Sequence, residues 1–162
     1  ITQEHGYGCA VACVAFITKR SYKNTLKLFK NPKYALIRGH YCKEIIEALE
    51  NAGLNYEYCY AKKSKLKYLP LDNVIVFTKR SKKYPIGHYL VHHKNSWMNP
   101  WINFPKINSA ESGFSKRLPG RAQWIIYKVK KQARALNTQA QNLNVSHRQI
   151  PKDYTCNSFY LF

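Results

Sequence analysis

The hydrophobic pattern in the N-terminal part of the chain predicts helices. Residues 9–18 are small and apolar on every side, which predicts a buried central helix, because a surface helix would carry a polar stripe. Ser21 is the expected N-cap of a second helix that reaches Phe29. A third helix is expected over residues 40–52, where Gly53 follows the C-cap.

Farther along the chain the pattern changes to that of strands. Lys94-Asn95 lies between two β-prone runs and predicts a hairpin turn. Since helices come first and strands follow, the order predicts an α+β fold with N-terminal helices packed on a C-terminal antiparallel sheet. The expected strands are Tyr56–Tyr60, Asn73–Thr78, His88–His92, Ser96–Met98 and Gln123–Val129.

The C-terminal part of the chain has a different composition. Residues 130–162 are rich in Gln and Asn and show no clear period before an aromatic end. We therefore expect one domain over residues 1–129, followed by a polar extension over residues 130–162. This extension is expected to be either a tail or a short helix that packs on the outside.

The charge of the chain is strongly unbalanced. It has 27 Lys and Arg against 8 Asp and Glu, for a formal net charge of +19. Such a field attracts polyanions, so RNA, DNA, an anionic membrane surface or an acidic protein is a candidate partner. An equally simple interpretation is a solvated basic surface.

Cysteine content and hydropathy indicate the compartment. The five cysteines match neither a disulfide framework nor zinc spacing, so a reduced, cytosolic chain is expected, with Cys13 in the core and Cys42 and Cys59 buried or half-buried. No apolar stretch of the sequence is long enough to span a bilayer. Because the chain starts at Ile1 rather than Met, we expect that upstream sequence is missing, which also fits a toxin domain delivered into a target cell.

The candidate nucleophile is Cys9. It stands at the start of the buried helix, where the positive end of the helix dipole is expected to lower the pKa of a thiol. Gly6 and Gly8 let the backbone turn sharply into the helix and leave room for a substrate. Gln3 precedes Cys9 by six residues, and its amide is a candidate hydrogen-bond donor to an oxyanion, beside the backbone N–H of Cys9.

A thiol nucleophile needs a base. His88 begins a strand at a sheet edge, and Asn99 lies across the predicted hairpin, where its amide can orient the second ring nitrogen. We expect His5 and His40 to face solvent, and His92 and His93 to lie on the hairpin surface. A metal site built from the histidines at 88, 92 and 93 would have no carboxylate near in sequence, so neither a metal nor a cofactor is expected.

The motif Gln3-x5-Cys9-x3-Cys13 resembles the start of the bacteriocin-processing cysteine peptidases. These are papain-like domains that remove double-glycine leaders at bacterial ABC exporters. The likeness continues in the run Gly-His-Tyr-Leu-Val around His88, and Asn99 stands before a Pro where the family has Asp. In element order the resemblance covers most of the chain, up to about residue 129.

The resemblance implies a papain-like cysteine peptidase fold. It also implies roles for four residues, with Cys9 as nucleophile, His88 as base, Asn99 as the residue that orients it and Gln3 as oxyanion donor. At two positions the chain departs from the family pattern, since Gly8 replaces Asp and Ala10 replaces Gly.

These observations support two hypotheses of function. The first is a stand-alone cysteine hydrolase, a peptidase or amidase that acts on a peptide or protein substrate. The second is a papain-like bacterial toxin domain that binds or cleaves RNA, such as tRNA, through its basic surface, with an immunity or inhibitor protein as a further partner. A catalytically inactive interaction domain is a third alternative.

Overall fold

Helix α1 is the centre of the helical layer. It spans Cys9–Thr18, as predicted, and residues Ala10–Ala15 are fully buried. Because its side chains are small on every side, the neighbouring elements approach it closely, which explains why this segment carries no polar stripe. Lys19 ends the helix in a left-handed conformation with a φ of 55°.

Three shorter or more exposed helices contact α1, namely α2 (Tyr22–Leu26), α3 (Tyr34–Ile37) and α4 (Cys42–Asn51). The hydroxyl of Ser21 accepts the backbone N–H of Asn24 at 3.3 Å, which confirms Ser21 as the N-cap of α2. This helix ends before Phe29, so it is shorter than predicted. α4 confirms the third predicted helix, and α3 was not predicted because a single turn has no period to detect.

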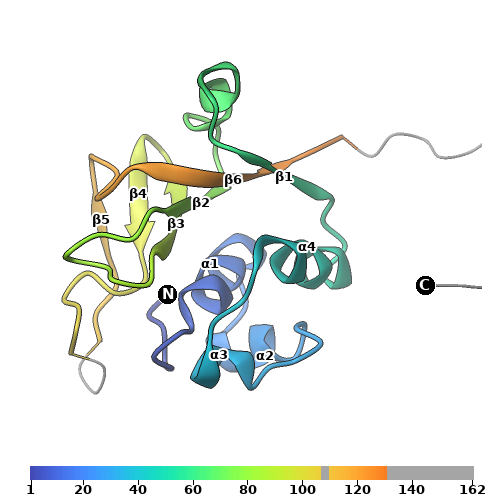
Figure 1. Cartoon of the computed structure of the whole chain (residues 1–162). Coiled ribbons are helices and arrows are strands. Elements are labelled where there is room, and N and C mark those ends of the chain that lie inside the picture. The colour runs from blue at the N-terminus through green and yellow to red at the C-terminus, as the bar shows by residue number, and fades with distance from the viewer. Residues whose placement is uncertain (107–109, 131–162) are drawn as a thin grey trace, which may run out of the picture. The chain divides into compact units, whose positions relative to one another are not determined.

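The strands follow the helices and form one six-stranded antiparallel sheet (Figure 1). They are β1 (Tyr56–Tyr60), β2 (Val74–Thr78), β3 (His88–His93), β4 (Ser96–Asn99), β5 (Gly113–Ser115) and β6 (Ala122–Lys128). Their order across the sheet is β1-β6-β2-β3-β4-β5. The five predicted strands are confirmed, and the short β5 was missed. Lys94 and Asn95 have positive φ values of 46° and 58°, as a tight hairpin turn between β3 and β4 requires.

Different elements pack on the two faces of the sheet. The helices pack on one face, where Ile75 and Ile126 join their core (Figure 1). On the other face, Val76 and Ile125 form a smaller core with the segment around the 3-10 helix η1 (Lys63–Tyr68). This arrangement of helices on one face of an antiparallel sheet confirms the predicted α+β class.

The computed structural model describes residues 1–106 and 110–130. The predicted extension over residues 130–162 lies almost entirely outside the described residues, so the extension and the domain boundary near residue 129 stay predictions. Within the described part of the chain, no helix is long and apolar enough to cross a membrane.

The entry into α1 depends on the missing side chain of Gly8. A Cβ at this position would overlap the hydroxyl of Tyr22 and would lie 3.1 Å from the carbonyl oxygen of His5. The Tyr22 hydroxyl also hydrogen-bonds to Nδ1 of His5 at 3.1 Å. Tyr22 therefore occupies the space that a side chain at position 8 would need, which explains physically why this chain carries Gly there.

We predict that Gly8→Ala lowers the free energy of unfolding by about 1–3 kcal/mol through overpacking. Tyr22→Phe in the same chain removes the overlapping oxygen and should restore part of the loss. Gly6→Ala is the matched control, because nothing lies within 4 Å of a Cβ at that position. Urea denaturation measures all three variants. Equal destabilisation by Gly6→Ala and Gly8→Ala would contradict this packing account.

Candidate active site

Cys9 is the first residue of α1, and Gly8 is its N-cap. The backbone N–H of Gly8 donates to the carbonyl of His5 at 2.9 Å, which closes a tight turn directly before the helix. Cys9 is partly exposed, whereas Cys13, one turn later, is fully buried in the core as predicted. The sequence around Cys9 therefore brings a single thiol of this helix to the surface.

The ring of His88 is fixed by Asn99. Nε2 of His88 and Oδ1 of Asn99 are 2.8 Å apart, and His88 is only 3 % exposed. Oδ1 also accepts the backbone N–H of Trp101 at 3.0 Å, while Nδ2 of Asn99 donates to the hydroxyl of Tyr84 at 2.9 Å. Since Oδ1 is an acceptor, Nε2 of the neutral ring carries the proton, and Nδ1 has the free lone pair.

Tyr84 completes this support. Its ring stacks on the ring of His88 with a centroid distance of 4.3 Å and an interplanar angle of 7°. Its hydroxyl donates to the carbonyl of Trp101 at 3.3 Å. Neither Tyr84 nor the backbone of Trp101 was predicted to support His88 and Asn99. The one local signal was their spacing, with Tyr84 shortly before His88 and Trp101 shortly after Asn99.

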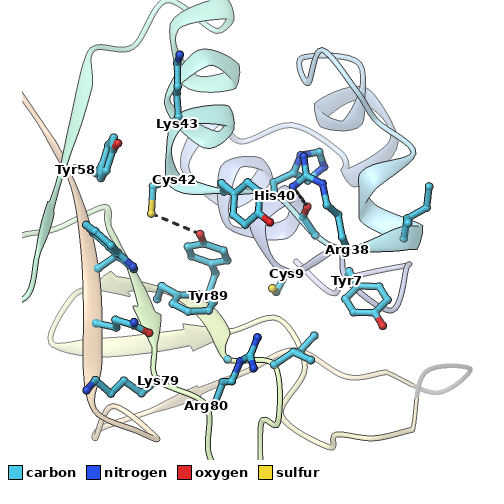
Figure 2. A pocket seen from close by; sticks show the side chains of 18 residues that line it. Tyr7, Cys9, Arg38, His40, Cys42, Lys43, Tyr58, Lys79, Arg80 and Tyr89 are labelled. Atoms are coloured by element: carbon cyan, nitrogen blue, oxygen red, sulfur yellow. Dashed lines mark hydrogen bonds between the residues drawn. The ribbon is translucent and has the colours of Figure 1, made fainter. Parts of the chain in front are cut away.

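The elements that carry the candidate thiol and the candidate base, α1 and β3, pack against each other. The backbone N–H of Tyr89, the residue after His88, lies near enough to the sulfur of Cys9 to favour its thiolate form. Cys9, Gly87 and Tyr89 line a groove of about 1020 Å³, in which Figure 2 labels Cys9 and Tyr89. His88 is buried and is not among the residues that line this groove. Between these two described residues, Cys9 and His88, no hydrogen bond is formed. Such contacts are often loose without substrate and tighten in the complex.

Both groups are neutral near pH 7. Although part of the Cys9 side chain is exposed at the groove, the protein packed around its sulfur raises the pKa of the thiol to about 11, and the N–H groups of Tyr89, Ala10 and Cys9 itself oppose the shift. Burial also lowers the pKa of His88 to about 4, which the hydrogen bond to Asn99 opposes. The expectation that the helix start lowers the thiol pKa is therefore wrong for this structure, because burial outweighs the nearby N–H groups.

Gln3 is buried beside the turn that leads into α1. Its Nε2 group donates to the carbonyl of His5 at 2.9 Å and to that of Gly6 at 3.3 Å. Its Oε1 atom is buried and has no hydrogen-bond partner. Both N–H groups of the amide are therefore engaged within the turn, and the donor role expected for Gln3 requires the longer bond to break.

Two predictions about the other histidines are wrong. His40 is 4 % exposed rather than solvent-facing, because its ring packs on Phe29 at a centroid distance of 4.2 Å. His92 is buried rather than on the hairpin surface, since its Nδ1 bonds to the carbonyl of Leu71 at 3.1 Å. Cys42 and Cys59 are buried and half-buried, as expected. Within residues 1–106 and 110–130, no group of three potential ligands could hold a metal ion.

A helix that presents a cysteine to a histidine-bearing antiparallel sheet defines the class of papain-like cysteine peptidases. The family model described as the Peptidase C39 family matches residues 1–115, which include Gln3, Cys9, His88 and Asn99. The chain therefore belongs to this family, the bacteriocin-processing papain-like cysteine peptidases. No curated protein and no solved structure matches the chain.

We predict that the free energy of unfolding falls as the pH drops from about 6.5 to about 4. Between these pH values His88 is protonated in the unfolded state but neutral in the folded state, so the free energy of unfolding rises with pH. The full difference is about 3 kcal/mol, at 1.36 kcal/mol for each pKa unit. Urea denaturation at several pH values measures it.

His88→Gln should reduce this pH dependence without abolishing it. The remainder comes in part from His40, because burial lowers its pKa to about 4 as well. The difference between the two pH profiles isolates His88 from the carboxylates that titrate in the same range. Identical profiles for the wild-type chain and His88→Gln would contradict a buried, neutral His88.

Proposed function

We propose that this chain hydrolyses amide bonds of peptides, with Cys9 as nucleophile and His88 as general base. The observation that carries the proposal is the hydrogen-bonded fixation of His88 by Asn99 at 2.8 Å, one residue from the backbone amide that contacts the Cys9 sulfur. Such fixation prepares one ring nitrogen, Nδ1, to accept a proton. Membership in a cysteine peptidase family supports a peptide as substrate.

The Cys9 thiol and the His88 imidazole are both neutral, so the proposed reaction begins with a proton transfer between them. Nδ1 of His88 takes the thiol proton as the Cys9 sulfur forms a bond to the carbonyl carbon of the substrate. The backbone N–H of Cys9, at the start of α1, donates to the oxyanion. The imidazolium then returns the proton to the leaving amine as the C–N bond breaks. Water attacks the resulting thioester, again with His88 as base, and releases the acid and the free thiol.

Gln3 is the proposed second donor to the oxyanion. The 3.3 Å bond to Gly6 is the longer of its two bonds, so it is the one that rotation of the amide would release. The remaining bond to His5, at 2.9 Å, would keep the side chain in place. Loss of one such donor typically lowers kcat by about 100-fold or more.

We predict that Cys9→Ala abolishes peptide cleavage and covalent capture by a peptide epoxide. Cleavage is measured by mass spectrometry on a peptide library prepared from a whole proteome, and capture is mapped to the modified residue. Cys59→Ser is the matched control, because this half-buried thiol lies on β1 and outside the groove. If Cys9 reacts with the epoxide no faster than Cys59, or if Cys9→Ala cleaves as the wild type does, the proposal fails and the inactive-domain alternative is favoured.

We predict that Tyr84→Phe lowers kcat by about tenfold with little change in KM. The variant keeps the stacked ring but leaves Nδ2 of Asn99 without its acceptor, so the hold on His88 loosens. Tyr84→Leu also removes the stacking and should cost more. Steady-state kinetics on a cleaved library peptide measures both. A change confined to KM would contradict a positioning role for Tyr84.

The RNA-directed toxin domain remains the alternative function. Its support is the net charge of +19, which concerns affinity for polyanions and not chemistry. The thiol, the fixed imidazole and the family membership all concern acyl transfer, and they favour the peptidase.

A further inference from the structure

The groove beside Cys9 is bordered by cations on two sides. Arg38 and Lys43 line it on the helical side, and Lys79 and Arg80 line it at the end of β2 (Figure 2). None of the eighteen described residues that line the groove is Asp or Glu. Its volume of about 1020 Å³ is at the upper end of the range for ligand sites, so several side chains of a ligand can enter.

One of the four cations is already paired. The two guanidinium NH groups of Arg38 donate to the carboxylate of Glu44 at 2.6 Å and 3.2 Å. The same guanidinium lies over the rings of Tyr34 and Tyr41, with distances to their centroids of 3.7 Å and 4.4 Å. The other three cations of the groove make no ion pair with any described residue. They therefore have charge available for a bound anion.

The floor of the groove is aromatic. Trp124, Phe77 and Tyr89 line the groove and are directly paired residues on β6, β2 and β3, so their side chains form one row across the helical face of the sheet. Tyr60 on β1 pairs with Trp124 and extends this row beyond the groove. The row ends at Tyr89, whose backbone N–H contacts the Cys9 sulfur. A chain that lies along this row reaches the thiol, with apolar side chains on the rings and charged ones at the rim.

The form of the floor favours a peptide over a nucleic acid. Bases bind by stacking on open aromatic faces. Here Tyr58 and Tyr60 pack against Trp124 at interplanar angles of 65° and 88°, and Phe77 is tilted by 51° against Tyr89. Rings packed in this way offer edges and crevices, which suit aliphatic side chains better than flat bases.

We propose that the groove selects peptides that carry Asp or Glu next to bulky apolar residues, and that Lys79 and Arg80 determine this selectivity. The cleavage of such peptides rests on the proposed peptidase function. Their binding to the groove can be tested independently of that function. The carboxylates meet the unpaired cations in a partly enclosed groove, where charge pairs are stronger than on an open surface.

The first experiment measures binding to the full chain carrying Cys9→Ala, which prevents turnover. The probes are a short tetramethylrhodamine-labelled peptide that alternates Glu with Leu and Ala, and its partner in which every Glu is Gln. We expect fluorescence anisotropy to give an affinity for the acidic probe at least about tenfold higher, which corresponds to about 1.4 kcal/mol. Equal affinities for the two probes would overturn the proposal.

A protein with so many cations binds any acidic peptide to some extent, so the location of the effect needs a matched control. Lys79→Glu with Arg80→Glu should abolish the preference for the acidic probe. Lys116→Glu with Arg117→Glu makes the same change of net charge at exposed residues outside the groove, and it should keep most of the preference. Equal losses in the two double variants would overturn the proposal.

A variant that fails to fold would also lose binding, so the milder pair Lys79→Gln with Arg80→Gln is measured beside it, and circular dichroism checks each chain. An intermediate loss of preference in a folded glutamine variant supports the proposal. An unchanged preference in that variant overturns it.

The second experiment separates this inference from the peptidase proposal. We expect the peptide library cut by the wild-type chain to show Asp and Glu enriched around the cleaved bonds, and the Lys79→Glu with Arg80→Glu variant to lose the enrichment. Cleavage without the enrichment overturns the inference alone. Acid-selective binding without any cleavage overturns the peptidase proposal and leaves the groove as a peptide-binding site.

Single-stranded oligo(U) tests the other polyanion. The proposal is overturned, and the groove is a nucleic-acid site, when three results occur together. Oligo(U) displaces the acidic probe and binds more tightly than that probe does. The Lys79→Glu with Arg80→Glu variant weakens oligo(U) binding more than the Lys116→Glu with Arg117→Glu variant does. Oligo(U) binding that is weakened equally by both charge-reversing double variants is a property of the whole basic surface and supports the assignment of the groove to peptides.

Discussion

The site depends on one buried hydrogen bond, between Nε2 of His88 and Oδ1 of Asn99. A buried imidazole without partners would be free to choose either tautomer and several orientations. Asn99 removes that freedom because the backbone N–H of Trp101 and the hydroxyl of Tyr84 fix its own amide. Because Nε2 is protonated, the lone pair lies on Nδ1. The amide of Asn99 and the two groups that fix it therefore determine which nitrogen serves as base. The stacked ring of Tyr84 holds the imidazole plane.

Burial has a second consequence for the chemistry. It favours the neutral forms of both the thiol and the imidazole, so the proposed attack begins with proton transfer rather than with a preformed ion pair. The unpaired cations of the groove lie beside this neutral centre. A bound carboxylate would therefore meet positive charge at the rim while the reacting atoms stay in a region of low polarity. In this account, the groove cations bind the carboxylates of the substrate, and the fixed orientation of the His88 ring serves the reaction.

Much of the fold could be predicted from the sequence because its strongest signals are local. The uniformly apolar segment 9–18 predicted α1, and the alternation and turn residues predicted five strands. The missed elements, α3 and β5, are too short to carry a period. The candidate residues Cys9, His88 and Asn99 were predicted from spacing and resemblance, whereas Tyr84 contacts His88 and Asn99 only in the folded chain. The pKa of Cys9 and the burial of His40 also depend on packing across the molecule, which no local pattern reports.

The most direct test of the central claim is the nitrogen NMR spectrum of the chain with ¹⁵N-labelled histidine near pH 7, for the wild type and for Cys9→Ala. The account predicts that His88 is neutral and protonated at Nε2, and that the Nδ1 resonance changes when the neighbouring thiol is removed. A His88 that is doubly protonated, that carries its proton on Nδ1, or that does not respond to Cys9→Ala would contradict it.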